Sequence, residues 1–172
     1  MKLGAIPPSS TQTVHRIMAA NRGKNTTIER KLRRGLSAVG APRSRAHFRV
    51  GPTRVDLAFP SQHVAVQIHG CFWHHCPRCN LPIPRTNRAY WRRKFAINRS
   101  RDARSKREIR KVGWKLIEVW EHEIDEDLQA CCHRVVDVIQ LQARAQGAKK
   151  SASTTSLSRS GNGPKAPIVR SL

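Results

Sequence analysis

Residues 55–79 read VDLAFPSQHVAVQIHGCFWHHCPRC, and this stretch joins two apolar runs to a cluster of metal-capable side chains. The runs span residues 55–59 and 64–68, and the short connection PSQH predicts a β-hairpin. Each run holds one polar residue, Asp56 in the first and Gln67 in the second. A carboxylate inside an apolar strand is costly unless it binds something. Asp56 is therefore the first candidate for a functional residue.

The segments on both sides of the hairpin have helical and strand patterns. One segment before the hairpin and two segments after it have apolar residues at helical spacing. A short apolar run, typical of a strand, separates the two later segments. The predicted elements are helix 25–40, basic helix 85–111, strand 114–120 and helix 125–144. This order predicts an α/β fold in which helices flank a small mixed β-sheet on both faces.

The two ends of the chain differ in composition from its centre. Residues 1–12 are rich in Pro, Ser and Thr, and residues 145–172 are rich in small residues and contain Lys and Arg but no acid. Such compositions favour disorder, so we expect a flexible N-terminus, one domain over 13–144 and a disordered basic tail. No apolar segment has the length of a secretion signal core or a membrane span, which predicts a cytoplasmic, nucleoid-associated protein.

The chain is strongly basic. It carries 33 Lys and Arg against 11 Asp and Glu, for a formal net charge of +22. A surface of this kind repels itself unless it meets a polyanion, and nucleic acid is the leading candidate because phosphate contacts release counterions. A ribosomal or histone-like structural protein would show the same charge. An anionic membrane is a weaker alternative, since no basic amphipathic helix of the interfacial type stands out.

The cysteines in the quoted stretch have the spacing of a metal site. Cys71, Cys76 and Cys79 supply three thiolates within nine residues. Structural zinc takes four N or S ligands, and the best fourth candidate is His122, just past strand 114–120, because a strand end holds a ligand rigidly. This set predicts a closed, structural zinc site. The alternative is a group of ordinary core cysteines.

Asp56 lies in the first strand of the predicted hairpin, and His69 directly follows the second. Such strands lie ~4.8 Å apart, so their ends can bring both side chains to one point. A carboxylate with a backbone carbonyl suits Mg²⁺, and a nearby neutral imidazole can activate or orient water. The alternative is that Asp56 caps a turn and the histidines pack, and the residue pattern favours neither interpretation.

Phe72 and Trp73 lie between the candidate ligands. If their loop faces DNA, they can insert between base steps and unstack them. The alternative is that they pack beneath the metal-binding loop, and Trp91 has the same two options.

Three segments together resemble the very short patch repair endonucleases (Vsr): HGCFWH, TNRAYWRRKFAINRSRD and GWKLIEVWE. The resemblance covers about residues 13–123. It implies a restriction-endonuclease-like fold and Mg²⁺-dependent nicking of one DNA strand 5′ to the T of a T:G mismatch. It further implies that the protein acts as a monomer on double-stranded DNA with a T:G mismatch, without a membrane and with mismatch-repair proteins as candidate partners. The rivals are a nuclease of the same fold in restriction or phage defence, and a non-catalytic zinc protein that binds DNA.

The resemblance also implies roles for single residues. The matched catalytic residues are Asp56, His69, His74, Glu29 and Asp102. Asp56 matches a metal-binding aspartate, and Ile68 occupies the position whose backbone carbonyl also holds Mg²⁺. The aromatic residues that match a wedge into the duplex are Phe72, Trp73 and Trp91. Many family members have His at the second zinc position and Cys after VWE, where this chain has Cys76 and His122, so the exchange preserves a Cys3His set.

Overall fold

The computed structural model describes the backbone of residues 26–157 and the side chains of residues 26–148. The elements are α2 (Thr27–Ala38), β1 (Arg45–Ala46), β2 (Arg49–Val50), β3 (Thr53–Arg54), β4 (Leu57–Phe59), β5 (Val64–His69), α3 (Arg88–Lys111), β6 (Lys115–Trp120), α4 (Glu121–Glu126) and α5 (Leu128–Leu157). Residues 1–25 and 158–172 lie outside this description. They include the expected flexible N-terminus, the expected start of the domain and the end of the expected tail.

The predicted hairpin, β4 and β5, forms the centre of a mixed sheet with the order β1-β4-β5-β6, and the strand after the basic helix, β6, is one edge. β4 and β5 are antiparallel, which confirms the hairpin, and β5 runs parallel to β6 with His69 opposite Trp120. The first strand is shorter than predicted, since β4 begins at Leu57 and Asp56 lies in a bend directly before it. The Asp56 side chain accepts the Ile68 amide hydrogen, which a longer ladder would donate to the backbone.

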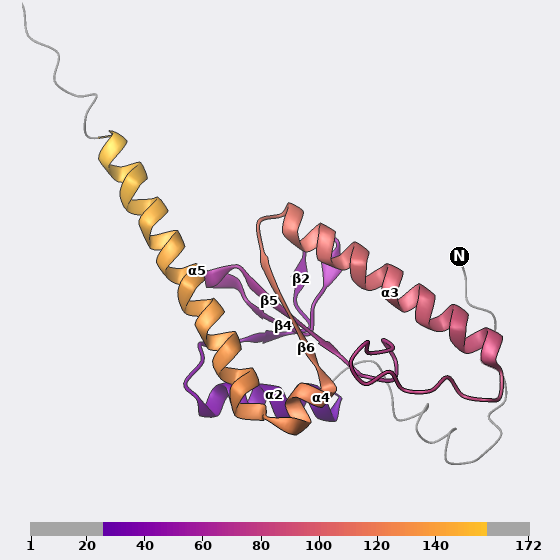
Figure 1. Ribbon diagram of the computed structural model, residues 1–172. Coiled ribbons are helices and arrows are strands. Elements are labelled where there is room, and N and C mark those ends of the chain that lie inside the picture. The colour runs from indigo at the N-terminus through magenta and orange to yellow at the C-terminus, as the bar shows by residue number, and fades with distance from the viewer. Residues whose placement is uncertain (1–25, 158–172) are drawn as a thin grey trace, which may run out of the picture.

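Helices cover both faces of the sheet, as the order of elements predicts (Figure 1). On one face, apolar residues of β4, β5 and β6 pack with α2, α4 and α5 in the larger core. On the other face, Ala58 and Ala65 pack with Ile109 of α3 in a smaller core. Alternate residues of a strand point to opposite faces, so Gln67, two residues after Ala65, also lies on the α3 face.

The helix ends largely follow their sequence signals. Thr26 is the N-cap of α2, and its side-chain oxygen accepts a hydrogen bond from the Glu29 amide at 3.3 Å. Gly40 and Gly113, with φ of 73° and 75°, follow α2 and α3 in the left-handed conformation that ends many helices. None of the helices within residues 26–157 is long and apolar enough to span a membrane.

Helix α5 is longer than the sequence predicted. It continues to Leu157, although a disordered tail was expected from residue 145 onward. Residues 142–150 read QARAQGAKK, and most of them are good helix formers, so the helix can propagate beyond the part that packs on the sheet. In Figure 1 its C-terminal part extends away from the other elements.

Candidate active site

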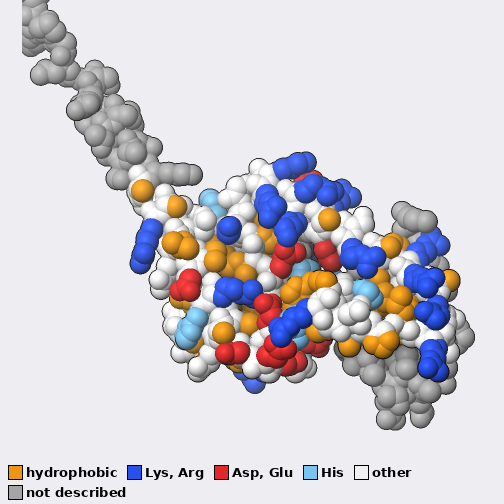
Figure 2. All heavy atoms as spheres, in the orientation of Figure 1, with side chains coloured by type: hydrophobic (Ala, Val, Ile, Leu, Met, Phe, Trp, Pro, Cys, Tyr) orange, Lys and Arg blue, Asp and Glu red, His pale blue; other side chains and the backbone are white. Residues whose placement is uncertain are grey.

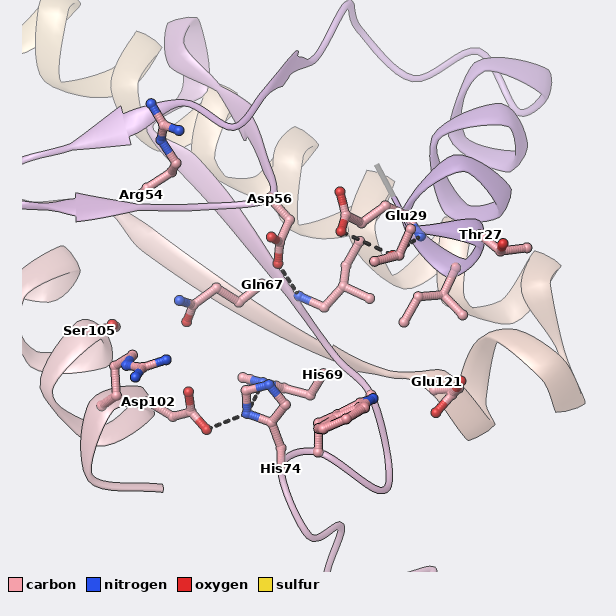
Figure 3. Close-up of a pocket in the computed structure, with 16 residues that line it drawn as sticks. Thr27, Glu29, Arg54, Asp56, Gln67, His69, His74, Asp102, Ser105 and Glu121 are labelled. Atoms are coloured by element: carbon pink, nitrogen blue, oxygen red, sulfur yellow. Dashed lines mark hydrogen bonds and ion pairs between the residues drawn. The ribbon is translucent and has the colours of Figure 1, made fainter. Parts of the chain in front are cut away.

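A cavity of about 460 Å³ opens where the N-terminal end of α2, the end of the hairpin and helix α3 meet (Figure 3). The residues that line it include all five predicted catalytic residues, Glu29, Asp56, His69, His74 and Asp102, together with Ile68. These residues come from α2, the hairpin, the following loop and α3. The fold therefore brings side chains together that the sequence places up to 73 residues apart, from Glu29 to Asp102.

Asp56 directly precedes β4 and lies at the edge of this cavity. Its Oδ2 accepts a hydrogen bond of 2.7 Å from the Ile68 amide, which leaves Oδ1 available to a cation. Burial raises the pKa of Asp56 to about 6, and the nearby Glu29 carboxylate raises it as well. A buried carboxylate with a raised pKa is stabilised in its charged form by an opposite charge, so this position fits a divalent cation.

The second group in the cavity is a pair of histidines joined to a carboxylate. His74 Nδ1 lies 2.6 Å from Asp102 Oδ2 and 3.3 Å from His69 Nδ1, and Figure 3 shows His74 between these two partners. A carboxylate only accepts, so His74 Nδ1 carries a proton toward Asp102, and Nε2 is the nitrogen with a lone pair when the ring is neutral. Burial lowers the pKa of His69, and the neighbouring His74 lowers it further. The group can therefore accept a proton from water at His74 Nε2.

The loop that carries His74 is tied to the sheet and to α3. The His74 amide donates to the Gly70 carbonyl at 3.1 Å, which closes a turn directly after β5. The buried Asn98 of α3 donates from Nδ2 to the Trp73 carbonyl at 2.6 Å. Asn98 lies one helical turn before Asp102, so the same face of α3 holds both the loop and the histidine.

Two neighbours of the predicted residues were not foreseen. His47 lies beside Glu29, with 3.7 Å between His47 Nε2 and Glu29 Oε2. Glu118 of β6 lies 3.6 Å from His69 Nε2 through Oε1 and pairs with Lys106 of α3 through Oε2. Glu118 is a carboxylate in an apolar strand, which is the signal that identified Asp56. No such signal marks His47, because apolar residues in the segment before the hairpin do not recur at the spacing of a helix or a strand.

The four residues of the predicted zinc site lie together, and we call them the Cys3His cluster. Their ligand atoms all lie within 4.8 Å of one another in Cys71, Cys76, Cys79 and His122. His122 Nδ1 is 3.2 Å from Cys71 Sγ and 3.5 Å from Cys76 Sγ. β5 and β6 are parallel and end side by side, so the loop after one strand meets the first turn after the other.

The donor chemistry of the Cys3His cluster fits zinc. Three sulfurs and one ring nitrogen are the donors that a tetrahedral structural zinc prefers. Burial raises the pKa of the Cys71 thiol to about 12, so this thiol would remain protonated without a cation beside it. The Cys71 amide donates to Glu121 Oε2 at 2.9 Å, and this bond fixes the first ligand against α4. Within the described residues no disulfide links the cysteines, which are all free.

The aromatic residues form one packed group beneath the loop. Phe72 is the centre, with ring-centroid distances of 5.3 Å to Trp73, 5.1 Å to Trp91 and 5.6 Å to Phe95. Trp91 is buried, whereas Phe72 and Trp73 are only half-buried. In the free protein these side chains therefore pack against α3, and the accessible part of the group belongs to Phe72 and Trp73.

Helix α3 presents a strongly basic surface beside the cavity. Figure 2 shows Lys and Arg side chains along the part of the molecule that α3 forms. The exposed basic residues of this helix are Arg88, Arg92, Arg93, Arg99, Arg101, Arg104, Arg107, Arg110 and Lys111. Arg101 also lines the cavity, as does Arg54 from β3. This surface can follow a phosphate backbone up to the acidic and histidine groups.

A half-buried carboxylate and a carboxylate-paired histidine, in an open cavity on an arginine-rich surface, define a site for hydrolysis of a polyanion, the class to which nucleases belong. The sequence model of one family, described as DNA mismatch endonuclease Vsr, matches residues 10–80. The DNA mismatch endonuclease Vsr of Escherichia coli is 32% identical over 108 residues, which is 60% of this chain and 66% of that protein.

Two longer matches carry a different description. The type II nicking enzyme V.NaeI of Lentzea aerocolonigenes is 37% identical over 141 residues, covering 79% of this chain and 82% of that protein. The type II nicking enzyme V.XorIIP of Xanthomonas oryzae pv. oryzae is 35% identical over 124 residues, covering 72% of this chain and 89% of that protein.

The chain belongs to the Vsr family and is a DNA endonuclease. The family implies a restriction-endonuclease-like fold, and the mixed sheet flanked by helices agrees with it.

Proposed function

We propose that this endonuclease nicks one strand of duplex DNA 5′ to the T of a T:G mismatch and so begins very short patch repair. The observation that carries the proposal is the cavity that joins Asp56 to the His74–Asp102 pair beside a basic helix. The name of the Escherichia coli relative, a DNA mismatch endonuclease, supports the mismatch as substrate. We propose a monomer as the acting form, with mismatch-repair proteins as candidate partners and one domain that begins near residue 13.

Asp56 and the Ile68 backbone carbonyl are the groups we propose to hold Mg²⁺. Mg²⁺ prefers oxygen ligands and retains several waters, so one carboxylate and one carbonyl are a sufficient protein contribution. When bound there, the cation neutralises charge that develops on the scissile phosphate. The hydrogen bond from the Ile68 amide to Asp56 Oδ2 keeps the carboxylate at the cavity edge before DNA arrives.

His74 is the group we propose to activate water. His74 Nε2 accepts a proton as the water oxygen bonds to phosphorus, the bond from phosphorus to the leaving oxygen breaks, and that oxygen takes a proton from solvent to become the hydroxyl end of the nick. Asp102 keeps the correct ring nitrogen protonated and stabilises the imidazolium that results. His69 is buried beside His74 and, with its lowered pKa, stays neutral, so it supports this proton transfer without repelling the imidazolium.

Phe72 and Trp73 are the residues we propose to enter the duplex beside the mismatch. Insertion of an aromatic side chain costs a few kcal/mol of unstacking, and the cost is lower at a mismatched step. Trp91 is buried beneath Phe72, so we propose that it packs against the wedge and does not itself enter the duplex. A zinc ion in the Cys3His cluster would stiffen the loop that carries the wedge and His74.

A second candidate function is nicking within a restriction or phage-defence system, with a specificity other than T:G. The observation that favours it is the description of two relatives as type II nicking enzymes. Both candidates use the same catalytic groups, so only the substrate separates them.

The test is incubation of the purified protein and Mg²⁺ with matched T:A and mismatched T:G duplexes of otherwise equal sequence. Strand-specific end labels on a denaturing gel locate any nick. The proposal predicts a single nick 5′ to the mismatched T and little cleavage of the T:A duplex. Equal nicking of both duplexes would support the restriction or defence function instead.

A further inference from the structure

A second group of potential metal ligands lies at the cavity besides the histidine pair, and two of its members, Glu29 and Asp56, line the cavity. One ligand atom each of Glu29, His47 and Asp56 lies within 4.8 Å of the other two. The side chains of His47 and Glu29 are only 20% and 12% exposed, and 3.7 Å separates His47 Nε2 from Glu29 Oε2. Two carboxylates and one imidazole thus face the same small volume at the end of the hairpin.

The position of His47 is imposed by strand pairing. Its amide donates to the Asp56 carbonyl at 2.9 Å, directly after the two residues of β1 that pair with β4. His47 has a φ of 50°, in the left-handed region that is uncommon for residues other than glycine. Backbone strain of this kind persists only where the surroundings determine it, and it is concentrated at functional sites. The same pairing therefore fixes both the imidazole and the carboxylate of Asp56.

A separate feature of the cavity also points to a cation. The β4–β5 register pairs Leu57 with Val66, and its continuation places Gln67 opposite Asp56. Gln67 lines the cavity, and its side-chain oxygen Oε1 is buried without a hydrogen-bond partner in the described part of the chain. Buried acceptors are almost always satisfied, so an oxygen left open beside the half-buried carboxylate of Asp56 fits a site completed by a cation and its waters.

The imidazole changes which cation the site prefers. Mg²⁺ is a hard ion that takes oxygen ligands, whereas divalent transition metals accept nitrogen together with oxygen. We propose that His47 and Glu29 join Asp56 in holding the active-site cation, and that His47 shifts the preference of the site from Mg²⁺ toward a transition-metal dication such as Mn²⁺. This inference rests on the proposed function, in which a cation binds at Asp56.

The test is Mn²⁺ binding to the full chain, measured without DNA through the electron paramagnetic resonance signal of free Mn²⁺. One equivalent of zinc is present so that the thiols take up no Mn²⁺, and added Mg²⁺ measures competition. The test variant is His47→Asn, because Asn tolerates the left-handed conformation. The matched control is His63→Asn at the opposite end of the hairpin, where His63 has a φ of 53° and stacks on Trp114.

We expect His47→Asn to weaken Mn²⁺ binding at least ~10-fold and Mg²⁺ binding less than ~3-fold, as loss of a nitrogen ligand requires. His63→Asn should change neither affinity. Glu29→Gln leaves the backbone at residue 47 untouched and should also weaken Mn²⁺ binding at least ~10-fold. An unchanged ratio of Mn²⁺ to Mg²⁺ affinity in His47→Asn overturns the inference, and so does unchanged Mn²⁺ binding in Glu29→Gln.

Asp56→Ala separates this inference from the proposed function. If Asp56→Ala loses both Mn²⁺ binding and nicking while His47→Asn keeps the wild-type metal ratio, only the role of His47 fails. If Asp56→Ala retains metal binding and nicking, the proposed metal site itself is wrong, and the inference falls with it.

Discussion

The Cys3His cluster and the cavity around Asp56 share one loop, residues 70–76, but they are built from different donors and differ in access. The cluster holds three sulfurs and one nitrogen, and two of its cysteines are buried. The cavity holds carboxylate oxygens and ring nitrogens, is open to solvent, and has Arg54 and Arg101 in its lining. A closed set of four ligands can stabilise a loop but leaves no coordination position for substrate. An open site can bind substrate and water, but other contacts must hold its side chains in place. The two regions therefore divide structural and chemical roles within one turn of chain.

The largest effect is expected from a substitution that removes a ligand of the Cys3His cluster. Cys76→Ser should remove bound zinc and lower the melting temperature by at least ~10 °C, because structural zinc supplies folding free energy. Zinc content and thermal melting followed by circular dichroism measure both effects. Cys131→Ser, a buried cysteine of α5 outside the cluster, is the control and should keep its zinc. A Cys76→Ser protein that melts like the wild type would show that the cluster is ordinary core packing.

In the cavity, the substitution expected to lower the nicking rate most is at Asp56. Asp56→Ala should lower the nicking rate at least ~1,000-fold, since loss of a metal ligand removes several kcal/mol of transition-state stabilisation. DNA binding should persist or strengthen, because a negative charge near phosphate is lost. Single-turnover nicking and a binding titration at one salt concentration measure the two effects. The exposed Asp137→Ala on α5 makes the same charge change and should nick normally. Comparable nicking by both variants would exclude Asp56 as a metal ligand.

A smaller loss is expected at the partner of His74. Asp102→Asn keeps the shape of the side chain but removes the charge that stabilises the imidazolium, so nicking should fall ~100-fold. Glu108→Gln on the same helix is the control, since Glu108 pairs only with Lys111 in the described ion pairs. Metal affinity should stay at the wild-type value in both variants. A rate near wild type in Asp102→Asn would mean that the 2.6 Å contact is an ion pair without a role in proton transfer.

The smallest loss is expected at Glu118, which contacts the cavity only through His69. Glu118→Gln should lower the nicking rate by ~10-fold or less, because it weakens the orientation of one histidine and leaves the water-activating one in place. Lys106→Met, which breaks the ion pair but keeps Glu118, should have a still smaller effect. A loss as large as that of Asp102→Asn would instead place His69, and not His74, at the reacting water.

The sequence predicted the two regions unequally. The Cys3His cluster could be derived from residue types and spacing, because its three cysteines are local and His122 follows a recognisable strand. The hairpin and the mixed sheet followed from apolar patterning. The contact of His74 with Asp102 joins a loop to a helix through tertiary packing, so only the resemblance to a family pointed to it.

His47 was missed for a different reason. It precedes the hairpin in a segment with no periodic pattern, and its placement depends on a two-residue strand and a left-handed backbone. The length of α5 was underestimated because Ser, Gly and Lys in residues 145–172 favour disorder by composition, while the local run of Ala, Gln and Arg sustains a helix.

In the proposed function, the Cys3His cluster holds the loop that carries the aromatic wedge, and the wedge recognises the mismatch. The most direct test is the ratio of nicking rates on T:G and T:A duplexes for the wild type and Trp73→Ala, at one salt concentration and with zinc content measured. We expect unchanged zinc and a ratio reduced at least ~10-fold, since unstacking costs a few kcal/mol and a difference of ~1.4 kcal/mol between the two duplexes is a factor of ten. A Trp73→Ala protein that keeps its zinc and the wild-type ratio would show that the aromatic residues only pack the loop, and that the mismatch is recognised elsewhere.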